Sequence, residues 1–335
     1  MKKRILAIVL AAFMSMTLFV GCGAKQNNSE SSEIKKGFDG TITRIAGLKG
    51  PTSMGMVKLM EDNENKTTKH TYKFEIFGTA DEVTPKILQG ECDVAAIPVN
   101  LASVLYNKTG RDIQILAVNT LGVLYVVSKG EEVSSIAELK GKTIYATGKG
   151  STPEYTLRYI LQENGLDPDK DVKIEFKSEP AEIVSVLSTQ DSGIAMLPQP
   201  YVTVAQNTVE GLTVALNLTE EWDKLVLDSS LITGALVARS NFIKEHEGIV
   251  SDLLEEYKAS TEYVNANVEE AAALVEKYGI VKAAVAQKAI PECNITFING
   301  PDMKKTVSNY LQVLYDQNKA AIGGTLPGND FYYEK

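Results

Sequence analysis

An imperfect internal repeat constrains the fold of this chain more than any other feature of its sequence. The stretch Lys142–Glu154 (KTIYATGKGSTPE) has a weaker copy about one hundred residues earlier, in Thr43–Ser53 (TRIAGLKGPTS). The residues that the copies share are Ala46, Lys49, Gly50 and Thr52 in the first and Ala146, Lys149, Gly150 and Thr152 in the second. We therefore expect two similar halves.

The repeat continues downstream in constant register, although few positions are identical. The paired segments are Phe74–Phe77 with Ile174–Lys177, Glu82-Val83 with Glu182-Ile183, and Ala95–Pro98 with Ala195–Pro198. Each half predicts a βαβαβ lobe with a parallel-rich sheet and flanking helices. Ligands bind such sheets at the carboxyl ends of the strands. The sequence thus predicts a two-lobed α/β fold that closes over a ligand by a hinge with two crossings.

The second copy of the repeat predicts a strand, a glycine-rich turn and a helix start. Thr143–Ala146 forms the strand and Gly148-Lys149-Gly150 the turn, while Ser151 and Thr152 are good N-cap residues ahead of Pro153. The first N–H groups of a helix lack partners and carry partial positive charge. This turn is therefore a suitable place for an anionic or hydrogen-bond-accepting ligand.

Length and charge narrow the class of protein. The chain has 335 residues, enough for two domains with sizeable cores. Its formal net charge is −9, and removal of the N-terminal segment takes away three further positive charges, those of Lys2, Lys3 and Arg4. This balance argues against general nucleic-acid binding, although a local pocket can oppose the global charge.

The N-terminus predicts a secretory signal peptide over residues 1–21. A basic start is followed by the apolar run Ile5–Val20, which is slightly short for a membrane-spanning helix. Phe19-Val20-Gly21-Cys22 resembles a bacterial lipoprotein box, in which Cys22 is lipidated and becomes the new N-terminus, although the pattern prefers leucine at Phe19. The alternatives are an ordinary cleaved signal and an uncleaved anchor. The lipidated form would lie outside the cytoplasm, held to the membrane through Cys22.

The rest of the chain divides into segments by its strand and helix patterns. We expect a polar tether over 22–37, the first part of lobe 1 over 38–126, lobe 2 over 127–235, and the rest of lobe 1 with the C-terminal helices over 236–335. The first crossing is expected around Lys129–Leu139 and the return in the strand Leu231–Ala238. From Asn241 onward the predicted structure is helical, and Phe331–Tyr333 is expected to pack on the first lobe.

Two further expectations concern buried side chains. A disulfide between Cys92 and Cys293 could form outside the cytoplasm. Nothing in their spacing favours such a bond, so we expect two free buried thiols. Trp222 is the only tryptophan, and we expect it to pack within a lobe.

Several motifs in order resemble one protein family over Gly40–Tyr201. The motifs are Ile87–Ala95 (ILQGECDVA), Leu139–Ile144 (LKGKTI), Lys149–Thr152 (KGST), Leu166–Asp169 (LDPD) and Met196–Tyr201 (MLPQPY). They resemble the solute-binding lipoproteins of ABC importers of the nitrate, sulfonate and taurine type, whose fold family also includes binders of thiamine-precursor pyrimidines. The resemblance implies a type 2 periplasmic binding protein fold, a small solute, a membrane permease as partner, a monomer and no cofactor. The family often has a carboxylate where Gln199 stands, so specificity should not be copied from a relative.

The candidate ligand-binding residues lie at predicted strand ends and helix starts of both halves. They are Lys49, Pro51, Thr52, Ser53, Gly78, Thr79, Pro98 and Asn100 in the first half and Ser151, Thr152, Gln199 and Tyr201 in the second. Lys49 and Lys149 would favour an anion such as a sulfonate, nitrate or carboxylate, and Tyr201 would stack on a planar ligand. The alternatives are surface lysines, hydroxyls that only cap helices, and a tyrosine that only packs.

Three carboxylates also lie near predicted helix starts. Asp81, Glu154 and Glu179 are explained without a ligand by stabilisation of the helix macrodipole. If several of them point inward, the ligand is instead a cation, an amidine-like donor or a small nitrogenous heterocycle. The sequence leaves this choice open.

The sequence predicts a binding protein and not an enzyme. Its two histidines, His70 and His246, are expected to be solvated, and the HExxH, GxSxG and clustered Cys/His metal motifs are absent. We therefore expect no catalytic residue and no metal. The remaining alternative is a ligand-sensing lipoprotein that is not coupled to transport.

Overall fold

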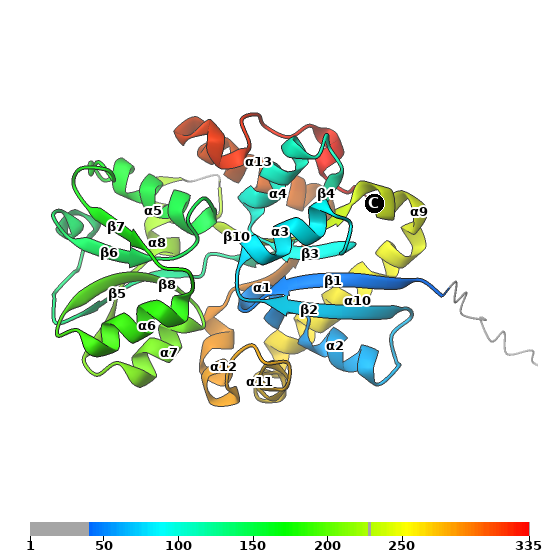
Figure 1. Ribbon diagram of the computed structural model, residues 1–335, viewed down its shortest axis with the longest axis horizontal. Helices are drawn as coiled ribbons and strands as arrows, with labels where there is room; N and C mark the ends of the chain where they lie inside the picture. Colours follow the sequence, from blue (N-terminus) through cyan, green and yellow to red (C-terminus); the bar gives the residue numbers. More distant parts are fainter. Residues whose placement is uncertain (1–39, 227–228, 335) are drawn as a thin grey trace, which may run out of the picture. The chain divides into compact units, whose positions relative to one another are not determined.

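The computed structural model describes residues 40–226 and 229–334, and Phe38–Lys335 form one compact unit. The predicted signal peptide (1–21), the lipidation site Cys22 and the tether (22–37) lie outside the described residues. Within the unit, two β-sheets are surrounded by helices, as Figure 1 shows, which confirms the two-lobed α/β fold class. We call the six-stranded sheet with its helices the first lobe and the five-stranded sheet with its helices the second lobe.

The sheet of the first lobe is built around the first half of the repeat. Its spatial order is β11 (Ile295–Ile298), β4 (Ile113–Leu121), β10 (Ile232–Arg239), β3 (Val94–Ile97), β1 (Ile42–Leu48) and β2 (Thr71–Phe77). β1 pairs in parallel with β2 and β3, whereas β10 pairs antiparallel with β3 and β4. The short apolar strand β3 is wholly buried, as expected for a strand covered on both faces.

The sheet of the second lobe repeats the parallel part of this arrangement. Its spatial order is β7 (Lys173–Phe176), β6 (Thr143–Ala146), β8 (Gly193–Pro198), β5 (Leu124–Lys129) and β9 (Leu212–Asn217). β6 pairs in parallel with β7 and β8, as β1 does with β2 and β3, while β5 pairs antiparallel with β8 and β9. Each sheet is therefore mixed, and its parallel part comes from the repeat.

The chain passes between the sheets at Gly122-Val123, before the region expected around Lys129–Leu139. β5 pairs along its length with β8, so it belongs to the second sheet from its first residue. The return follows α8 (Leu218–Leu225), and β10 lies entirely in the first sheet. After each crossing, the first strand joins its new sheet by antiparallel pairing: β5 pairs with β8 and β9, and β10 pairs with β3 and β4.

Helices cover both faces of each sheet. The α-helices are α1 (Pro51–Met54), α2 (Val57–Glu64), α3 (Ala80–Leu88), α4 (Val99–Lys108), α5 (Thr152–Glu163), α6 (Pro180–Thr189), α7 (Tyr201–Thr208), α8, α9 (Ser240–Glu245), α10 (Glu247–Ala266), α11 (Val268–Lys277), α12 (Ala283–Ala289) and α13 (Gly300–Gln317). Short 3-10 helices span Ile136–Leu139, Ile290–Glu292, Lys319–Ile322 and Asn329–Phe331. None of the described helices has the length and apolar content of a membrane span.

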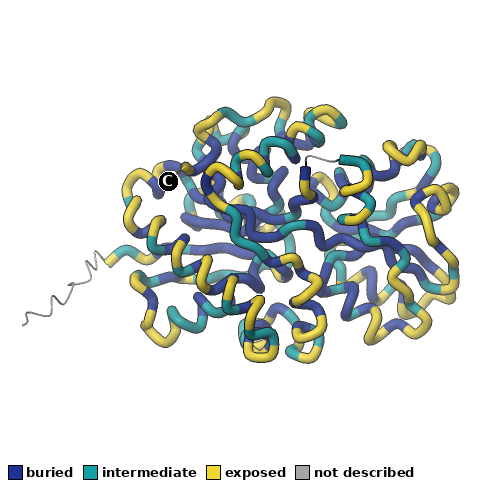
Figure 2. Tube along the Cα trace, turned by 180° about the vertical axis from the view of Figure 1, so that it is seen from behind, coloured by how far each residue is buried: buried dark blue, intermediate teal, exposed yellow. Residues whose placement is uncertain are grey.

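Separate apolar cores lie on the two faces of the first sheet. One joins the sheet to α3, α4 and α13, and the other joins it to α2, α9 and α10. The second sheet likewise has α5 on one face and α6 and α7 on the other. Figure 2 shows the buried strands inside and the exposed residues on the outer faces of the helices. The sheets are therefore held firmly, so that their strand ends are fixed in place.

Two local predictions are wrong. The C-terminal region expected to be helical from Asn241 contains the strand β11, whose β-prone sequence ITFI pairs with β4 at the sheet edge. The sequence of Met54–Asp62 predicts one continuous helix, but the structure interrupts it at Gly55-Met56, between the short α1 and the longer α2. In both cases the contacts of a short segment with its surroundings decide its secondary structure, and the apolar pattern of the longer stretch does not.

Three predictions about buried side chains are confirmed. Tyr333 N donates a hydrogen bond to Ile115 O (3.0 Å), which attaches the C-terminal tail to the first sheet. Trp222 is fully buried and its Nε1 donates to Ser229 O (2.9 Å). Cys92 and Cys293 are free and buried, and burial raises the pKa of the Cys92 thiol to about 11 and raises that of Cys293 as well.

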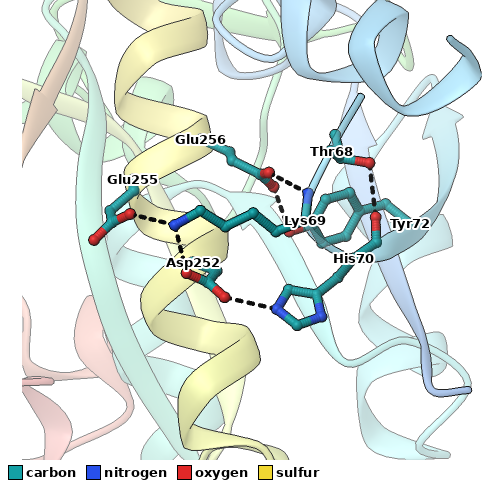
Figure 3. A network of polar contacts seen from close by, with 7 residues as sticks. All are labelled: Thr68, Lys69, His70, Tyr72, Asp252, Glu255 and Glu256. Atoms are coloured by element: carbon teal, nitrogen blue, oxygen red, sulfur yellow. Dashed lines mark hydrogen bonds and ion pairs between the residues drawn. The ribbon is translucent and has the colours of Figure 1, made fainter. Parts of the chain in front are cut away.

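His70 is not solvated, contrary to the prediction. It belongs to the polar network of Figure 3, in which its Nε2 lies 2.8 Å from Asp252 Oδ2 on α10. The neighbouring Lys69 Nζ contacts both Asp252 and Glu255 at 2.6 Å. These contacts hold Lys69 and His70, the polar residues just before β2, against α10.

Candidate ligand-binding site

A cavity of about 180 Å³ lies where the strand-end loops of the two lobes meet. The first lobe contributes the loops after β1, β2 and β3, and the second lobe contributes those after β6, β7 and β8. Thr120 near the end of β4, Val123 from the first crossing and Thr233 from β10 also line the cavity. Equivalent loops of the repeat therefore line one common cavity.

Nine of the twelve predicted site residues line this cavity. They are Lys49, Pro51, Thr52, Gly78, Thr79 and Pro98 from the first lobe and Ser151, Gln199 and Tyr201 from the second. The structure thus brings together residues that are far apart in the sequence. Their contact with a ligand remains a prediction.

The other three predicted residues lie beside the cavity and not in its wall. Ser53, Asn100 and Thr152 are fully buried. Thr152 Oγ1 donates to Asn100 Oδ1 (3.1 Å), and Asn100 Nδ2 donates to Ala321 O (2.9 Å) and approaches Gly150 O (3.4 Å). Asn100 and Thr152 therefore join the two lobes to each other and are occupied as hydrogen-bonding groups.

Several wall residues were not among the predicted site. They are Thr120, Thr147, Gly148, Ser178, Glu179 and Thr233, together with neighbouring apolar residues. The repeat register would have found two of them, because Ser178 and Glu179 are the counterparts of Gly78 and Thr79. Thr120 and Thr233 carry no local motif, and only the placement of the two crossings identifies them.

Five helices of at least eight residues begin at the cavity wall, and two of them are α4, which starts after Pro98, and α7, which starts at Tyr201. α3, α5 and α6 start directly after Thr79, Ser151 and Glu179, and none of these N-cap side chains caps its own helix. The loops ahead of α3 and α6 have the same local structure, since Gly78 N donates to Glu82 Oε2 (3.1 Å) and Ser178 N donates to Glu182 Oε2 (2.8 Å). The partial positive charge of these helix starts is directed at the same region.

Gln199 and Tyr201 present polar groups from the second lobe. Gln199 is almost fully buried, and its Oε1 accepts from Thr203 Oγ1 (2.9 Å). This bond leaves the amide N–H₂ as the group that the side chain offers to the cavity. Burial, reinforced by the charge of Glu179, raises the pKa of Tyr201, so its hydroxyl stays protonated at neutral pH.

Thr52 offers an unused hydroxyl in the wall of the first lobe. Its Oγ1 is buried and has no hydrogen-bond partner among the described residues. The side chain sits against Gly234 of β10, where a Cβ would lie 2.5 Å from Thr52 Cγ2 and 2.5 Å from Asn119 Oδ1. Gly234 therefore allows a close approach inside a strand, and a ligand would supply the missing partner of Thr52.

The charged wall residues differ between the lobes. Lys49 lines the cavity, whereas Lys149 points away, with its Nζ 5.9 Å from the centre of the Phe176 ring. Glu154 is occupied, since its Oε2 accepts from Gly150 N (2.6 Å) and its Oε1 from Arg158 Nε (2.8 Å). Glu179 lines the cavity, and its Oε1 lies 2.7 Å from the position that a Cβ on Gly78 would take.

Most of the polar side chains in the wall are neutral. Within residues 40–226 and 229–334, no group of three or more His, Cys, Asp or Glu side chains is placed to hold a metal ion. Neither His70 nor His246 belongs to the wall, and no cysteine does. What the wall offers is hydroxyl, amide and backbone donors, one lysine and one carboxylate.

Comparisons with known proteins agree with this description. The model of the NMT1-like family matches residues 71–277, which is more than half of the chain. No curated protein sequence gave a match. The first listed solved structures therefore report on the fold, since all are less than 25% identical.

Three solved structures illustrate the shared fold. An ABC transporter protein from Parabacteroides distasonis is 22% identical over 88% of this chain and 99% of its own, with a TM-score of 0.72. The alkanesulfonate-binding protein SsuA from Xanthomonas axonopodis pv. citri, bound to MOPS, is 14% identical over 86% and 94%, with a TM-score of 0.68. The nitrate-binding protein NrtA from Synechocystis PCC 6803 is 14% identical over 73% and 68%, with a TM-score of 0.59.

SsuA and NrtA are described as binding proteins and not as enzymes, in line with the predicted lack of catalytic activity. Their fold has two lobes, as this chain has, and the cavity described above lies between the lobes. The chain therefore belongs to the NMT1-like family and has the fold of the solute-binding proteins of ABC importers.

Proposed function

We propose that this protein is an extracytoplasmic receptor that captures a small solute with an anionic group, of the sulfonate or nitrate type, between its two lobes. The proposal rests on one observation: the equivalent loops of both halves of the repeat line one cavity, and five helices begin at its wall. Helix starts are favourable sites for anions because their N–H groups are unpaired and partially positive. The binding proteins SsuA and NrtA share the fold.

The size of the cavity favours a solute of few atoms. Pockets for drug-sized ligands have volumes from about 300 Å³ upward, whereas a cavity of about 150 Å³ is large enough for benzene. The volume here, about 180 Å³, is close to the second value. A nitrate ion or a short alkyl sulfonate fits this space, and a nucleotide does not.

Donors in the wall suit such a solute. Lys49 supplies a positive charge, and Thr52 Oγ1 supplies a hydroxyl without a partner. Gln199 and Tyr201 add an amide and a hydroxyl from the opposite lobe. The solute would hold the lobes together because it bonds to both, which is the basis of hinge closure around the crossing at Gly122-Val123 and the return before β10.

Delivery of the solute to an ABC permease is the remaining part of the proposal. It is supported by the fold shared with ABC-importer binding proteins and by the signal peptide and lipoprotein box that the sequence predicts at Cys22. Lipidation at Cys22 would hold the receptor beside the permease. A sensing lipoprotein would differ in a transport assay, where cells that lack the protein would take up the solute at the normal rate.

A thermal-shift experiment on the full-length protein tests the receptor. The compounds are nitrate, ethanesulfonate, taurine, a thiamine-precursor pyrimidine and guanidine, in a buffer free of sulfonates. A ligand at one hundred times its Kd adds about 2.7 kcal/mol to the stability of the folded protein, enough to raise Tm by several degrees. Stabilisation by nitrate, ethanesulfonate or taurine supports the proposal. Stabilisation by the pyrimidine or guanidine alone, or by no compound, contradicts it.

A further inference from the structure

We infer that the cavity is dipolar and that Glu179 selects a solute carrying a cationic group, so that the ligand is a small zwitterion with its anionic end toward the first lobe. The inference rests on the proposed function and names the substrate class of the same site. It comes from the two charged side chains of the wall, Lys49 and Glu179, which belong to different lobes. Glu179 is the one carboxylate among the wall residues that the structure describes.

The first lobe provides the positive wall. Lys49 precedes a turn that has no acidic residue, since the position equivalent to Glu154 is the buried Met54. In the second lobe, the carboxylate of Glu154 already occupies Gly150 N (2.6 Å). Thr52 Oγ1 adds a buried hydroxyl without a partner to the same side. An anionic group therefore meets the stronger positive field at the first lobe.

The second lobe provides the negative wall. Glu179 stands where the first half of the repeat has Thr79, and its carboxylate extends toward Gly78 on the opposite lobe, 2.7 Å from where a Cβ would be. No ion pair engages Glu179 or Lys49 within the part of the chain that the structure describes. A half-buried carboxylate without a cationic partner repels an anion that carries no compensating charge.

Tyr201 lines the cavity on the same side as Glu179. Its hydroxyl remains protonated because burial and the charge of Glu179 both raise its pKa. It cannot therefore neutralise the carboxylate, and the face of a tyrosine ring attracts an ammonium group in addition. The small volume keeps the two ends of the ligand close, so the cationic group is separated from the anionic one by only a few bonds. A short aminoalkanesulfonate or amino acid has this shape.

Isothermal titration of the full-length protein with matched ligands tests the inference. Taurine carries both charges, ethanesulfonate only the negative one and ethylammonium only the positive one. We expect taurine to bind about tenfold or more tightly than ethanesulfonate, because a charge-assisted hydrogen bond is made only with the ammonium group. The pair β-alanine and propanoate repeats the comparison for carboxylates.

Variants at the two walls assign the ends of the ligand. Glu179→Gln is expected to weaken taurine about tenfold and to leave ethanesulfonate unchanged or slightly tighter, which removes the preference. Lys49→Gln is expected to weaken both. The matched controls are Glu132→Gln, an exposed residue of the second lobe, and Lys149→Gln, whose side chain lies over Phe176 outside the wall. Neither control should change either affinity.

The outcomes separate this inference from the proposed function. If the wild-type protein binds ethanesulfonate or propanoate as tightly as the matching zwitterion, or if Glu179→Gln weakens both ligands equally, the inference is wrong and the anion receptor stands. If ethylammonium alone binds, or if none of these ligands binds, both are wrong. A melting temperature measured for each variant excludes loss of folding as the cause of a weaker affinity.

Discussion

The two glycine turns of the repeat, Lys49–Met54 and Lys149–Glu154, begin from nearly the same sequence and end in different roles. Lys49 faces the cavity, whereas Lys149 covers an aromatic ring. Their threonines differ in the same way: Thr52 is in the cavity wall with an unused hydroxyl, and Thr152 is buried and bonded to Asn100. The repeat therefore preserves the path of the backbone, while each side chain takes the role that its own neighbours allow.

The last residue of each turn accounts for much of this difference. Met54 is buried among the apolar residues of α11, α12 and their neighbours, which ends α1 after one turn. Glu154 instead accepts from Gly150 N and pairs with Arg158 one helical turn later, at the start of the twelve-residue α5. A sulfur-containing apolar residue anchors the first turn in a core, and a carboxylate stabilises the second turn as a helix start.

The largest effect is expected from making the first turn resemble the second. Met54→Glu places a carboxylate in an apolar core beside Cys293. The cost is about 4 kcal/mol or more in the free energy of unfolding, measured as a lower urea midpoint. Met54→Leu keeps the volume and should cost less than about 1.5 kcal/mol. Equal stability of the two variants would contradict the role given to Met54.

A smaller loss is expected when the link between the second turn and the first lobe is removed. Asn100→Ala leaves Thr152 Oγ1 and Ala321 O buried without their partner. Each unsatisfied group costs about 1–3 kcal/mol, so Tm should fall by several degrees. Ser185→Ala on an exposed helix face, where the hydroxyl bonds only Ala181 O, is the control. An unchanged Tm would mean that the lobes are not held by this contact.

The next largest loss of stability is expected from a substitution in β10 that crowds the first glycine turn. Gly234→Ala adds a Cβ at 2.5 Å from Thr52 Cγ2 and Asn119 Oδ1, so both side chains must move. Overpacking of this kind costs about 1–3 kcal/mol, and displacement of Thr52 should also weaken the solute. Gly248→Ala is the matched control, because nothing lies within 4 Å of the position that its Cβ would take. Reduced stability with unchanged affinity would separate Thr52 from the site.

The sequence predicted the fold through the repeat, and nine residues of the cavity wall through the loops that the repeat aligns. It failed where long-range contacts decide the outcome. Asn100 and Thr152 are polar residues at strand and helix ends, and nothing local shows that they bond to each other across the lobes. β11 is too short to be distinguished from helix by periodicity, and only its pairing with β4 makes it a strand.

Glu179 is a residue whose place the sequence left open. Its position at a helix start is explained by the macrodipole without a ligand, an inward orientation was the alternative, and the structure places it in the cavity wall. The repeat contained the missing information, because Thr79 at the equivalent position was already predicted to face the ligand. A repeat is therefore more informative when every predicted site residue is also tested at its counterpart.

The smallest effect on stability is expected from Ser151→Ala, which distinguishes the neighbouring hydroxyls of the second turn. Ser151 lines the cavity and its Oγ donates only to Gly148 O (2.8 Å), within the turn itself. We expect Tm to change little, because loss of one partly exposed hydrogen bond costs about 1 kcal/mol or less, while solute affinity falls by roughly tenfold if the hydroxyl binds the ligand. Thr152→Val should give the opposite result, a lower Tm with nearly unchanged affinity, because its hydroxyl serves Asn100. If both variants change the same quantity, the two hydroxyls share one role, and the division between ligand binding and lobe contact within this turn is wrong.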